Sequence, residues 1–436
     1  MKRRIVYGLV IAVLTVNFSV GAWIFSHAAQ KNDTIEPNLG LYSEVLQRVR
    51  AEYVDGQNLT YHDLTYAALK GMVKVLDPHS EFLDPAAYHD LQDDTEGQFG
   101  GLGLYVTVRS NYVTVITPME DTPGFRAGIL AGDRIIKINS EDAVKMPLED
   151  AVKKLRGKPG SRVTMTVERP SSGLVKNYTL IRAVIQVKMI EDINRKREFP
   201  LSDDKIGYVS IKQFGDKTGD ELEGALRKLQ AQGMKALILD LRWNPGGLLD
   251  EAVNVCQKFL PRGQLIVSTE GRDPAQNSVR NAAGSGDELH GMPIVVLVNL
   301  SSASASEIVT GCLQDLHRAI ILGEKTFGKG SVQSIFPFDD GSALKLTTAK
   351  YYTPSHRVIH EHGIMPDIVV PMSDDEEALL QFKRAPGGVE MLNETNRARL
   401  AKFQDPQLIR AQDLLKGILL YDSLNDVQTP AETADK

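Results

Sequence analysis

Apolar residues between residues 37 and 96 recur every third or fourth position, which is the spacing of amphipathic helices. The two clearest series are Leu41, Val45, Val49 and Tyr53, followed by Leu64, Ala68, Met72 and Val75. A helical region of this size buries little surface by itself. We therefore expect it to pack on the main body of the chain or on a second copy of it.

The period changes to two from about residue 98, where short alternating segments are broken by Gly, Pro and Asn. One short helix is expected among them at 148–155, and strands are expected at 105–108, 112–116, 134–138 and 163–167. The glycine-rich turn 100–104 leads straight into the first strand. A nucleotide-binding loop would have a strand before it and a helix after it, so the turn does not fit that motif.

Strand and helix alternate after about residue 205. The continuous apolar runs 236–241 and 294–298 are typical of strands buried on both faces. Amphipathic segments at 216–231, 248–260 and 304–317 complete an α/β pattern. Beyond about residue 375 the chain is polar and helical, at 374–382 and 407–420, and 429–436 has the composition of a disordered tail.

The first 30 residues have the pattern of a targeting segment. Three basic residues, 2–4, precede a mostly apolar run from Ile5 to Phe25, and Ser26-His27-Ala28 offers a cleavage site. The run exceeds a signal-peptide core of ~7–15 residues and approaches the ~20 residues that span a bilayer. We expect a signal peptide or a signal anchor, with the rest of the chain in the periplasm or cell envelope, released or anchored in the inner membrane.

Composition narrows the class of protein. The 436 residues are 42% hydrophobic and 24% charged, as in soluble multidomain proteins, and a net charge of −6 gives no basis for nucleic-acid binding. Cys256 and Cys312 lie in apolar, helix-like stretches, so we expect buried free thiols and no metal cluster. No cofactor is expected.

Residues 299–307 place a serine where a buried strand gives way to a helix. Small side chains around Ser304 admit a substrate backbone, and the N–H groups at a helix start are unpaired. Ser304 and Glu307 also match the Ser-x-x-Glu capping box, so a purely structural role is the alternative.

Lys329 lies between Gly328 and Gly330, which would let its side chain enter a tight site. A lysine base must be neutral, so its pKa of about 10.4 must fall toward 7 or 8, which desolvation can supply at about 4 kcal/mol. We expect Gln333, four residues later, to hold the amine by a hydrogen bond. A third segment, 240–248, closes a buried strand with Gly246-Gly247, whose N–H groups can face an oxyanion; an ordinary glycine-rich turn is the alternative.

Together these segments resemble the C-terminal processing peptidases, serine peptidases of the Ser–Lys type in family S41. The similarity runs from about residue 40 to 372 and includes segments 76–80, 100–103, 302–307, 326–333 and 346–354. The resemblance implies these site residues: the nucleophile Ser304, the base Lys329, the supporting Gln333, a charge-relay Asp315, and oxyanion N–H groups of Ala305 and of Gly246 or Gly247. The alternative for Asp315 is a helix cap or a salt bridge.

The resemblance also implies the fold, which is multidomain α/β. A crotonase/ClpP-like peptidase core at 186–375 would carry an inserted, mainly-β PDZ domain at 98–183, between helical regions at 37–96 and 376–436. In the PDZ domain a peptide would add as a strand beside 104–108, with its carboxylate at the turn formed by Gly101, Leu102, Gly103 and Leu104. Arg156 would report occupancy of this site to the core.

Two residues depart from the pattern of the family, and one loop is unusually rich in histidine. Trp243 replaces a small polar residue and is expected to narrow the cleft, and Ser301 stands where glycine is common. His356, His360 and His362 have the composition of a metal site, but we expect a solvated hairpin tip.

The expected function is that of an endopeptidase of the cell envelope, which recognises apolar C-terminal tails and cuts exported proteins or peptides. The helical terminal regions are expected to form a homo-oligomer. One alternative is a non-catalytic PDZ adaptor, against which the retention of Ser304, Lys329 and Gln333 argues. Another is a Ser–His–Asp hydrolase with His290 or His317 as base, but no Gly-x-Ser-x-Gly surrounds the serine.

Overall fold

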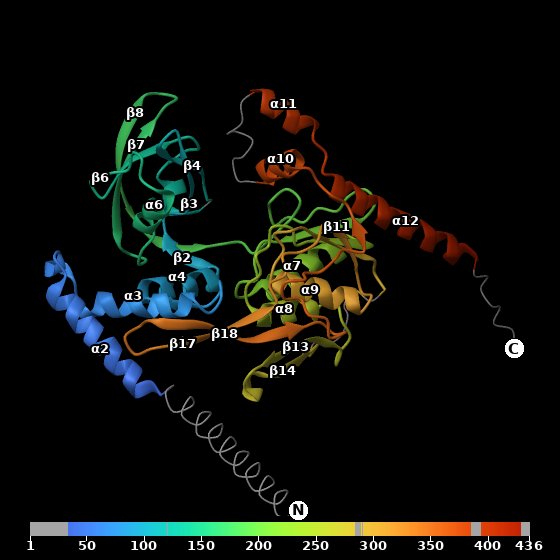
Figure 1. Ribbon diagram of the computed structural model, residues 1–436. Coiled ribbons are helices and arrows are strands. Elements are labelled where there is room, and N and C mark those ends of the chain that lie inside the picture. The colour runs from blue at the N-terminus through green and yellow to red at the C-terminus, as the bar shows by residue number, and fades with distance from the viewer. Residues whose placement is uncertain (1–33, 120, 284–288, 290, 385–393, 429–436) are drawn as a thin grey trace, which may run out of the picture. The chain divides into compact units, whose positions relative to one another are not determined.

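The computed structural model describes residues 34–119, 121–283, 289, 291–384 and 394–428 (Figure 1). The expected targeting segment and the tail 429–436 lie outside these residues. Within the described part, no helix has the length and apolarity needed to cross a membrane. The chain divides into two compact units, Met1–Phe82 and Leu83–Lys436.

The first unit contains α2 (Ile35–Glu52), the short 3-10 helix Gly56–Asn58 and α3 (Tyr61–Lys74), where the apolar series predicted helices. Thr60 caps α3 by accepting a hydrogen bond from the N–H of Asp63. No residue of α2 is buried. The division after Phe82 differs from the expected helical region 37–96, because α4 (Pro85–Glu96) falls in the second unit.

An antiparallel sheet forms the mainly-β part of the second unit (Figure 1). Its order is β3-β4-β5-β7-β8, and β6 pairs with β5. The strands are β3 (Leu104–Arg109), β4 (Tyr112–Pro118), β5 (Arg134–Ile138), β6 (Glu141–Asp142), β7 (Arg162–Arg169) and β8 (Leu174–Ile181). The helices α5 (Pro123–Arg126) and α6 (Leu148–Leu155) accompany them, and β2 (Gln98–Gly101) pairs with β9 (Ala183–Gln186) at the two ends of this part.

A second sheet has the order β10-β11-β12-β15-β16-β19 and is parallel except for β10 at its edge. These strands are β10 (Ile190–Glu191), β11 (Ile206–Ile211), β12 (Ala236–Asp240), β15 (Ile294–Val298), β16 (Ile320–Gly323) and β19 (Ile368–Val369). Every residue of β11, β12 and β15 is buried, which explains the continuous apolar runs.

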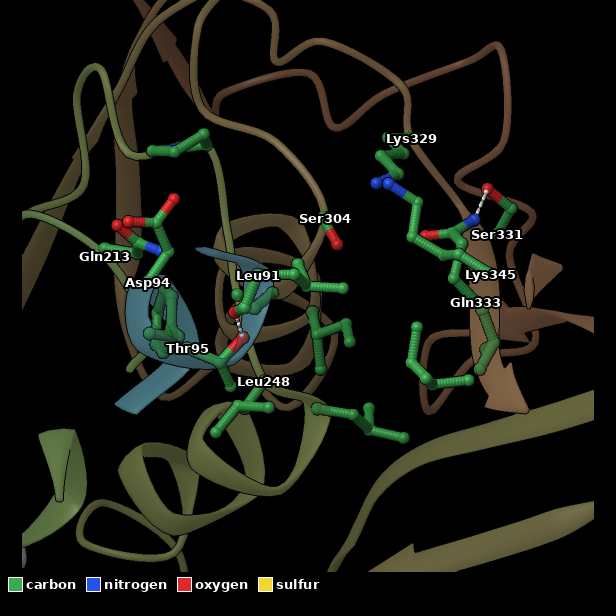
Figure 2. Close-up of a pocket in the computed structure, with 18 of the residues that line it drawn as sticks. Leu91, Asp94, Thr95, Gln213, Leu248, Ser304, Lys329, Ser331, Gln333 and Lys345 are labelled. Carbon is green, nitrogen blue, oxygen red and sulfur yellow. Dashed lines mark hydrogen bonds between the residues drawn. The ribbon is translucent and has the colours of Figure 1, made fainter. Parts of the chain in front are cut away.

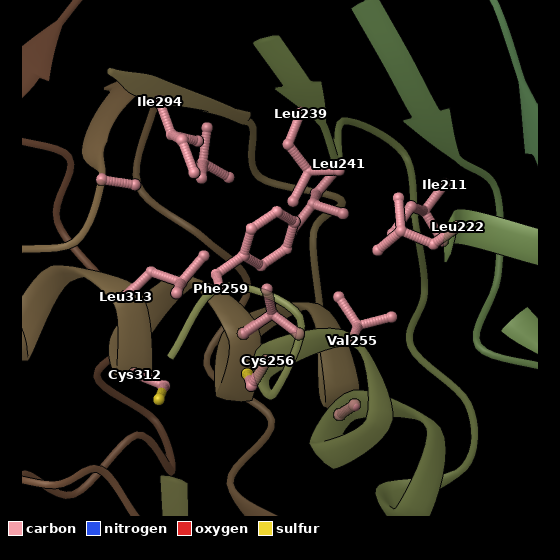
Figure 3. Packing of buried hydrophobic residues seen from close by; sticks show 14 of the residues in the cluster. Ile211, Leu222, Leu239, Leu241, Val255, Cys256, Phe259, Ile294, Cys312 and Leu313 are labelled. Atoms are coloured by element: carbon pink, nitrogen blue, oxygen red, sulfur yellow. The ribbon is translucent and has the colours of Figure 1, made fainter. Parts of the chain in front are cut away.

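Helices cover both faces of the parallel sheet. Alternate strand residues pack in one cluster with α7 (Thr218–Ala231), α8 (Leu249–Cys256) and α9 (Ala305–Asp315), shown in Figure 3. The other strand residues pack against Ala411 and Leu415 of α12 (Pro406–Gln428). Cys256 and Cys312 lie in the first cluster as buried free thiols, as predicted, and burial raises the pKa of the Cys256 thiol.

A further antiparallel sheet includes β17-β18-β13-β14, which the hydrophobic pattern did not predict as strands. These are β13 (Leu265–Gly271), β14 (Ser278–Asn281), β17 (Ser331–Pro337) and β18 (Ala343–Tyr352). The 3-10 helix Pro274–Gln276 joins β13 to β14, and β1 (Glu81–Leu83) spans the boundary between the two units. Two more helices, α10 (Asp374–Arg384) and α11 (Glu394–Lys402), precede α12.

Candidate active site

Three predicted segments leave the carboxyl ends of adjacent parallel strands. Segment 241–248 follows β12, 299–304 follows β15, and 324–330 follows β16. Such an edge is where ligands bind in open α/β sheets. Hydrogen bonds tie the segments together: Ala303 donates to the carbonyl of Asn244 at 3.0 Å, and Phe327 donates to that of Ser302 at 3.1 Å.

Ser304 occupies a strained turn between β15 and α9. Its φ of 57° and ψ of −115° are sparsely populated by residues with a side chain, and such conformations cost about 1–3 kcal/mol. Strain of this kind persists where the surrounding structure imposes it, often at functional sites. Ser304 is held in this conformation although its sequence lacks the Gly-x-Ser-x-Gly pattern of a nucleophile elbow.

Glu307 joins the turn at Ser304 to segment 324–330, the lysine loop, which carries Lys329. One carboxylate oxygen accepts from the N–H groups of Ser304 (2.9 Å) and Lys329 (2.8 Å). The other accepts from the N–H of Gly328 (2.7 Å) and the hydroxyl of Thr326 (2.6 Å). The side chain is completely buried, and this burial raises its pKa although the hydrogen bonds oppose the shift. The sequence pattern indicated only a helix cap here.

A cavity of about 570 Å³ lies over this junction. Ser304, Lys329 and Gln333 all line it, and Figure 2 shows Ser304 between residues of α4 and the residues of the lysine loop and β17. Part of its wall is apolar and consists of Leu91, Leu248, Leu249, Ile308 and Val332. Lys345 and Asp94 also line the cavity, which is large enough for several residues of an extended peptide.

The amide of Gln333 is oriented by its neighbours. Its nitrogen donates to the hydroxyls of Ser331 at 2.9 Å and Thr347 at 3.3 Å. The amide oxygen therefore remains as the acceptor, which is the atom that a lysine amine requires.

Gly246 and Gly247, in segment 241–248 (the oxyanion segment), have different roles. The N–H of Gly246 donates to the side-chain oxygen of Asn244 at 2.9 Å. A Cβ at Gly246 would lie 2.6 Å from the Cβ of Ser304, and one at Gly247 would lie 2.2 Å from the carbonyl oxygen of Phe214, so neither position accepts a side chain. Of the two, Gly247 is the candidate donor, together with the N–H of Ala305.

The structure separates Asp315 from the cavity. Ser304 precedes α9 and Asp315 ends it, and eleven helical residues extend about 16 Å. Asp315 accepts from the N–H and hydroxyl of Ser355, at 2.9 and 2.6 Å, and pairs with Arg357. Asp315 is not among the residues that line the cavity, and its contacts anchor the loop of Ser355, as the salt-bridge alternative predicted; the charge-relay role stays a prediction.

None of the predicted histidines that the structure describes lines the cavity. His317 lies just beyond the end of α9, and His290 is outside the described residues. In the predicted hairpin tip, His356 contacts Glu270 at 2.9 Å and stacks on Tyr352. The described residues contain no His, Cys, Asp or Glu group suited to a metal ion.

Trp243 points away from the cleft, so the expected narrowing is wrong. Its indole N–H donates to Glu377 of α10 at 2.9 Å, and its ring contacts the guanidinium groups of Arg242 and Arg384. Arg242 is buried and binds Asp240 on one side and Asp405 on the other. Trp243 and Arg242 thus connect the segment before the oxyanion glycines to the C-terminal helices.

A second cavity, of about 290 Å³, lies between β3 and α6. All five residues expected to bind a peptide line it: Gly101, Leu102, Gly103, Leu104 and Arg156. Arg156 also lies over the ring of Phe99 and pairs with Asp94 at 3.3 Å. Since Asp94 lines the cavity of Ser304, this pair lies between the two cavities.

Comparison with known proteins agrees with this architecture. The model of peptidase family S41 matches residues 205–370, and that of the PDZ domain matches residues 114–169. A carboxy-terminal-processing protease of Bartonella bacilliformis is 40% identical over 378 residues, covering 85% of this chain and 83% of the relative. The chain belongs to peptidase family S41. It is a serine-type peptidase related to the C-terminal processing proteases.

Two further relatives extend the comparison. A probable CtpA-like serine protease of Staphylococcus aureus is 38% identical to this peptidase over 362 residues, which cover 82% of this chain and 70% of the relative. A solved structure, a putative S41 protease of Bacteroides fragilis, is 20% identical with a TM-score of 0.50 and covers 86% of this chain and 97% of its own. This second likeness concerns the fold alone.

Proposed function

We propose that this peptidase is an endopeptidase of the cell envelope that captures apolar C-terminal tails in its PDZ domain and cleaves by Ser–Lys acyl-enzyme chemistry. The observation that carries the proposal is the convergence of the strained Ser304, Lys329 and Gln333 on one cavity. The targeting pattern of residues 1–30 supports the cellular location. We also retain the crotonase/ClpP-like description of the core as part of this proposal.

The proposed reaction begins with neutral Lys329. Its amine takes the hydroxyl proton of Ser304 while the serine oxygen attacks the scissile carbonyl carbon. The oxyanion that forms accepts hydrogen bonds from the N–H groups of Gly247 and Ala305. The Lys329 ammonium then gives its proton to the leaving amine, and the C–N bond breaks.

Hydrolysis of the acyl-enzyme reverses these roles. A water molecule loses a proton to Lys329 and attacks the ester carbon, and Ser304 recovers its proton as the product acid leaves. Gln333 supports both steps, because its amide oxygen accepts from the lysine amine and directs it toward the serine. The apolar wall formed by Leu248, Ile308 and Val332 favours apolar substrate side chains beside the scissile bond.

The test of the chemistry compares Ser304→Ala and Lys329→Ala with the wild-type chain on an unfolded protein substrate, with cleavage sites identified by mass spectrometry. Both variants should be folded and inactive, because the two groups act as a unit. Ser301→Ala and Lys325→Ala are matched controls, since both residues are exposed neighbours. Normal turnover in either site variant would overturn the mechanism, and a non-catalytic adaptor would show no wild-type cleavage.

Tail recognition has a separate test. The full-length Ser304→Ala variant should bind a peptide with an apolar C-terminus more tightly than its amidated twin, because amidation removes the charge that the N–H groups at 101–104 would bind. A charge-assisted hydrogen bond is worth roughly 1.5–3 kcal/mol, or on the order of ten- to a hundredfold in affinity. Equal affinities would mean that the groove does not read C-termini.

A further inference from the structure

Tyr351, in β18, is a buried tyrosine that the proposed reaction does not yet use. Its side chain is 2% exposed and lines the same cavity as Ser304 and Lys329. Its N–H donates to the carbonyl of Gly330 at 3.0 Å, and its hydroxyl donates to the carbonyl of Lys329. Through one residue, β18 therefore binds two successive carbonyl groups of the lysine loop.

Lys329 is consequently held from two directions. Its N–H donates to Glu307 of α9, and its carbonyl accepts from Tyr351 of β18. When both polar groups of a residue are fixed, its backbone dihedrals are fixed too, and with them the direction in which its side chain leaves. This matters most for lysine, whose long side chain has many rotamers.

Tyr351 and Ser304 line the same cavity. A phenol has one proton and can also accept. The Tyr351 proton is donated to the carbonyl of Lys329. Burial and the nearby charge of Glu307 raise the pKa of Tyr351, so the hydroxyl keeps its proton over the working pH range.

We propose, on the basis of the Ser–Lys chemistry proposed above, that Tyr351 is a positioning residue of the peptidase site. Its hydroxyl fixes the backbone of the base and thereby the direction in which the Lys329 side chain leaves. The competing explanation is packing alone, because the ring also belongs to the main hydrophobic cluster. The two explanations differ in what they require: positioning needs the oxygen atom, whereas packing needs only the ring.

The experiment uses the full-length chain and the Tyr351→Phe variant, which removes only that oxygen. The matched control is Tyr352→Phe, the same change at the next residue, whose ring stacks on His356 outside the cavity. We measure kcat, KM and the pH–rate profile with one peptide substrate, and thermal unfolding of each variant. For Tyr351→Phe we expect kcat to fall about tenfold or more with KM unchanged.

The pH–rate profile separates positioning from packing. A lysine whose backbone is less constrained is better hydrated, so the acid limb of the profile should move to higher pH in Tyr351→Phe. Amide hydrogen exchange at 328–331 should also become faster. A kcat within twofold of wild type, or an equal loss in Tyr352→Phe, would overturn the proposal.

A second variant covers the case in which Tyr351→Phe does not fold. 4-Aminophenylalanine at position 351 keeps the ring and an N–H donor, and should restore most of kcat; a folded but equally impaired protein would contradict the role of the donor. If Ser304→Ala were fully active, the proposed function would fail. If Ser304→Ala were inactive and Tyr351→Phe normal, only the inference about Tyr351 would fail.

Discussion

Glu307→Gln tests how strongly the junction of the site depends on one carboxylate. Each oxygen of Glu307 accepts two hydrogen bonds, and glutamine offers only one oxygen. Two bonds are lost, and an NH₂ group then faces other donors. Hydrogen bonds to a charged group contribute about 1.5–3 kcal/mol each, so the loss is at least about 3 kcal/mol. If this loss of free energy destabilises the transition state alone, kcat decreases about a hundredfold.

The assay compares kcat and thermal unfolding of Glu307→Gln with those of Glu251→Gln. Glu251, on α8, is a suitable control because it is also buried. It accepts hydrogen bonds from the N–H of Gly219 at 2.7 Å and from the side-chain amide of Asn254 at 2.8 Å. Both variants should be less stable, but the control should keep kcat within about threefold. A folded Glu307→Gln with nearly normal kcat would refute the reasoning, as would an equal loss of activity in the control.

Three further predictions concern other residues of the second unit. Gly247→Ala should lower both Tm and, by at least about a hundredfold, kcat, because its new Cβ meets the backbone of Phe214 and displaces the N–H of residue 247; normal kinetics would exclude Gly247 as an oxyanion donor. Asp315→Asn should keep kcat within about twofold but lower Tm, because Asp315 anchors a loop far from Ser304; an inactive, folded variant would support the charge relay. Although burial opposes it, the charges of Arg242 and Arg384 hold the pKa of Asp240 far below its usual range. The stability from Asp240 is therefore present above about pH 4 and is lost as pH falls through the depressed pKa, so Tm should fall in acid less steeply for Asp240→Asn than for wild type.

The parts of the fold that were predictable are those that a local pattern determines. The run 294–298 coincides with β15 because a strand buried on both faces must be continuously apolar. β18 was not predicted as a strand, because most of its residues are only half-buried and carry no clear alternation. The boundary after Phe82 was not predicted either, since α4 is a helix like α2 and α3 and a local pattern does not show to which unit a helix belongs.

The candidate site shows the same contrast between features that a local sequence pattern determines and features that depend on distant contacts. Ser304, Lys329 and Gln333 were predictable from their motifs, and all three line one cavity. Glu307 matched a capping box, and nothing local indicated that it also binds residues 326–329, about twenty positions away. Asp315 was assigned from its spacing to the serine, but a straight helix carries it away from the cavity. Contacts between distant segments decide such roles.

The buried pairing of Arg242 with Asp405 also has a consequence for the order in which parts of the molecule fold. Arg242 follows β12, whereas its partners Asp405 and Gln407 lie 163 and 165 residues later in the chain, next to the start of α12. Until Asp405 and Gln407 have packed against it, the charged guanidinium of Arg242 lacks half of its buried hydrogen bonds, and an incompletely paired buried charge is strongly unfavourable. The segment before the oxyanion glycines is therefore fully supported only when the chain around Asp405 and Gln407 has packed against the parallel sheet.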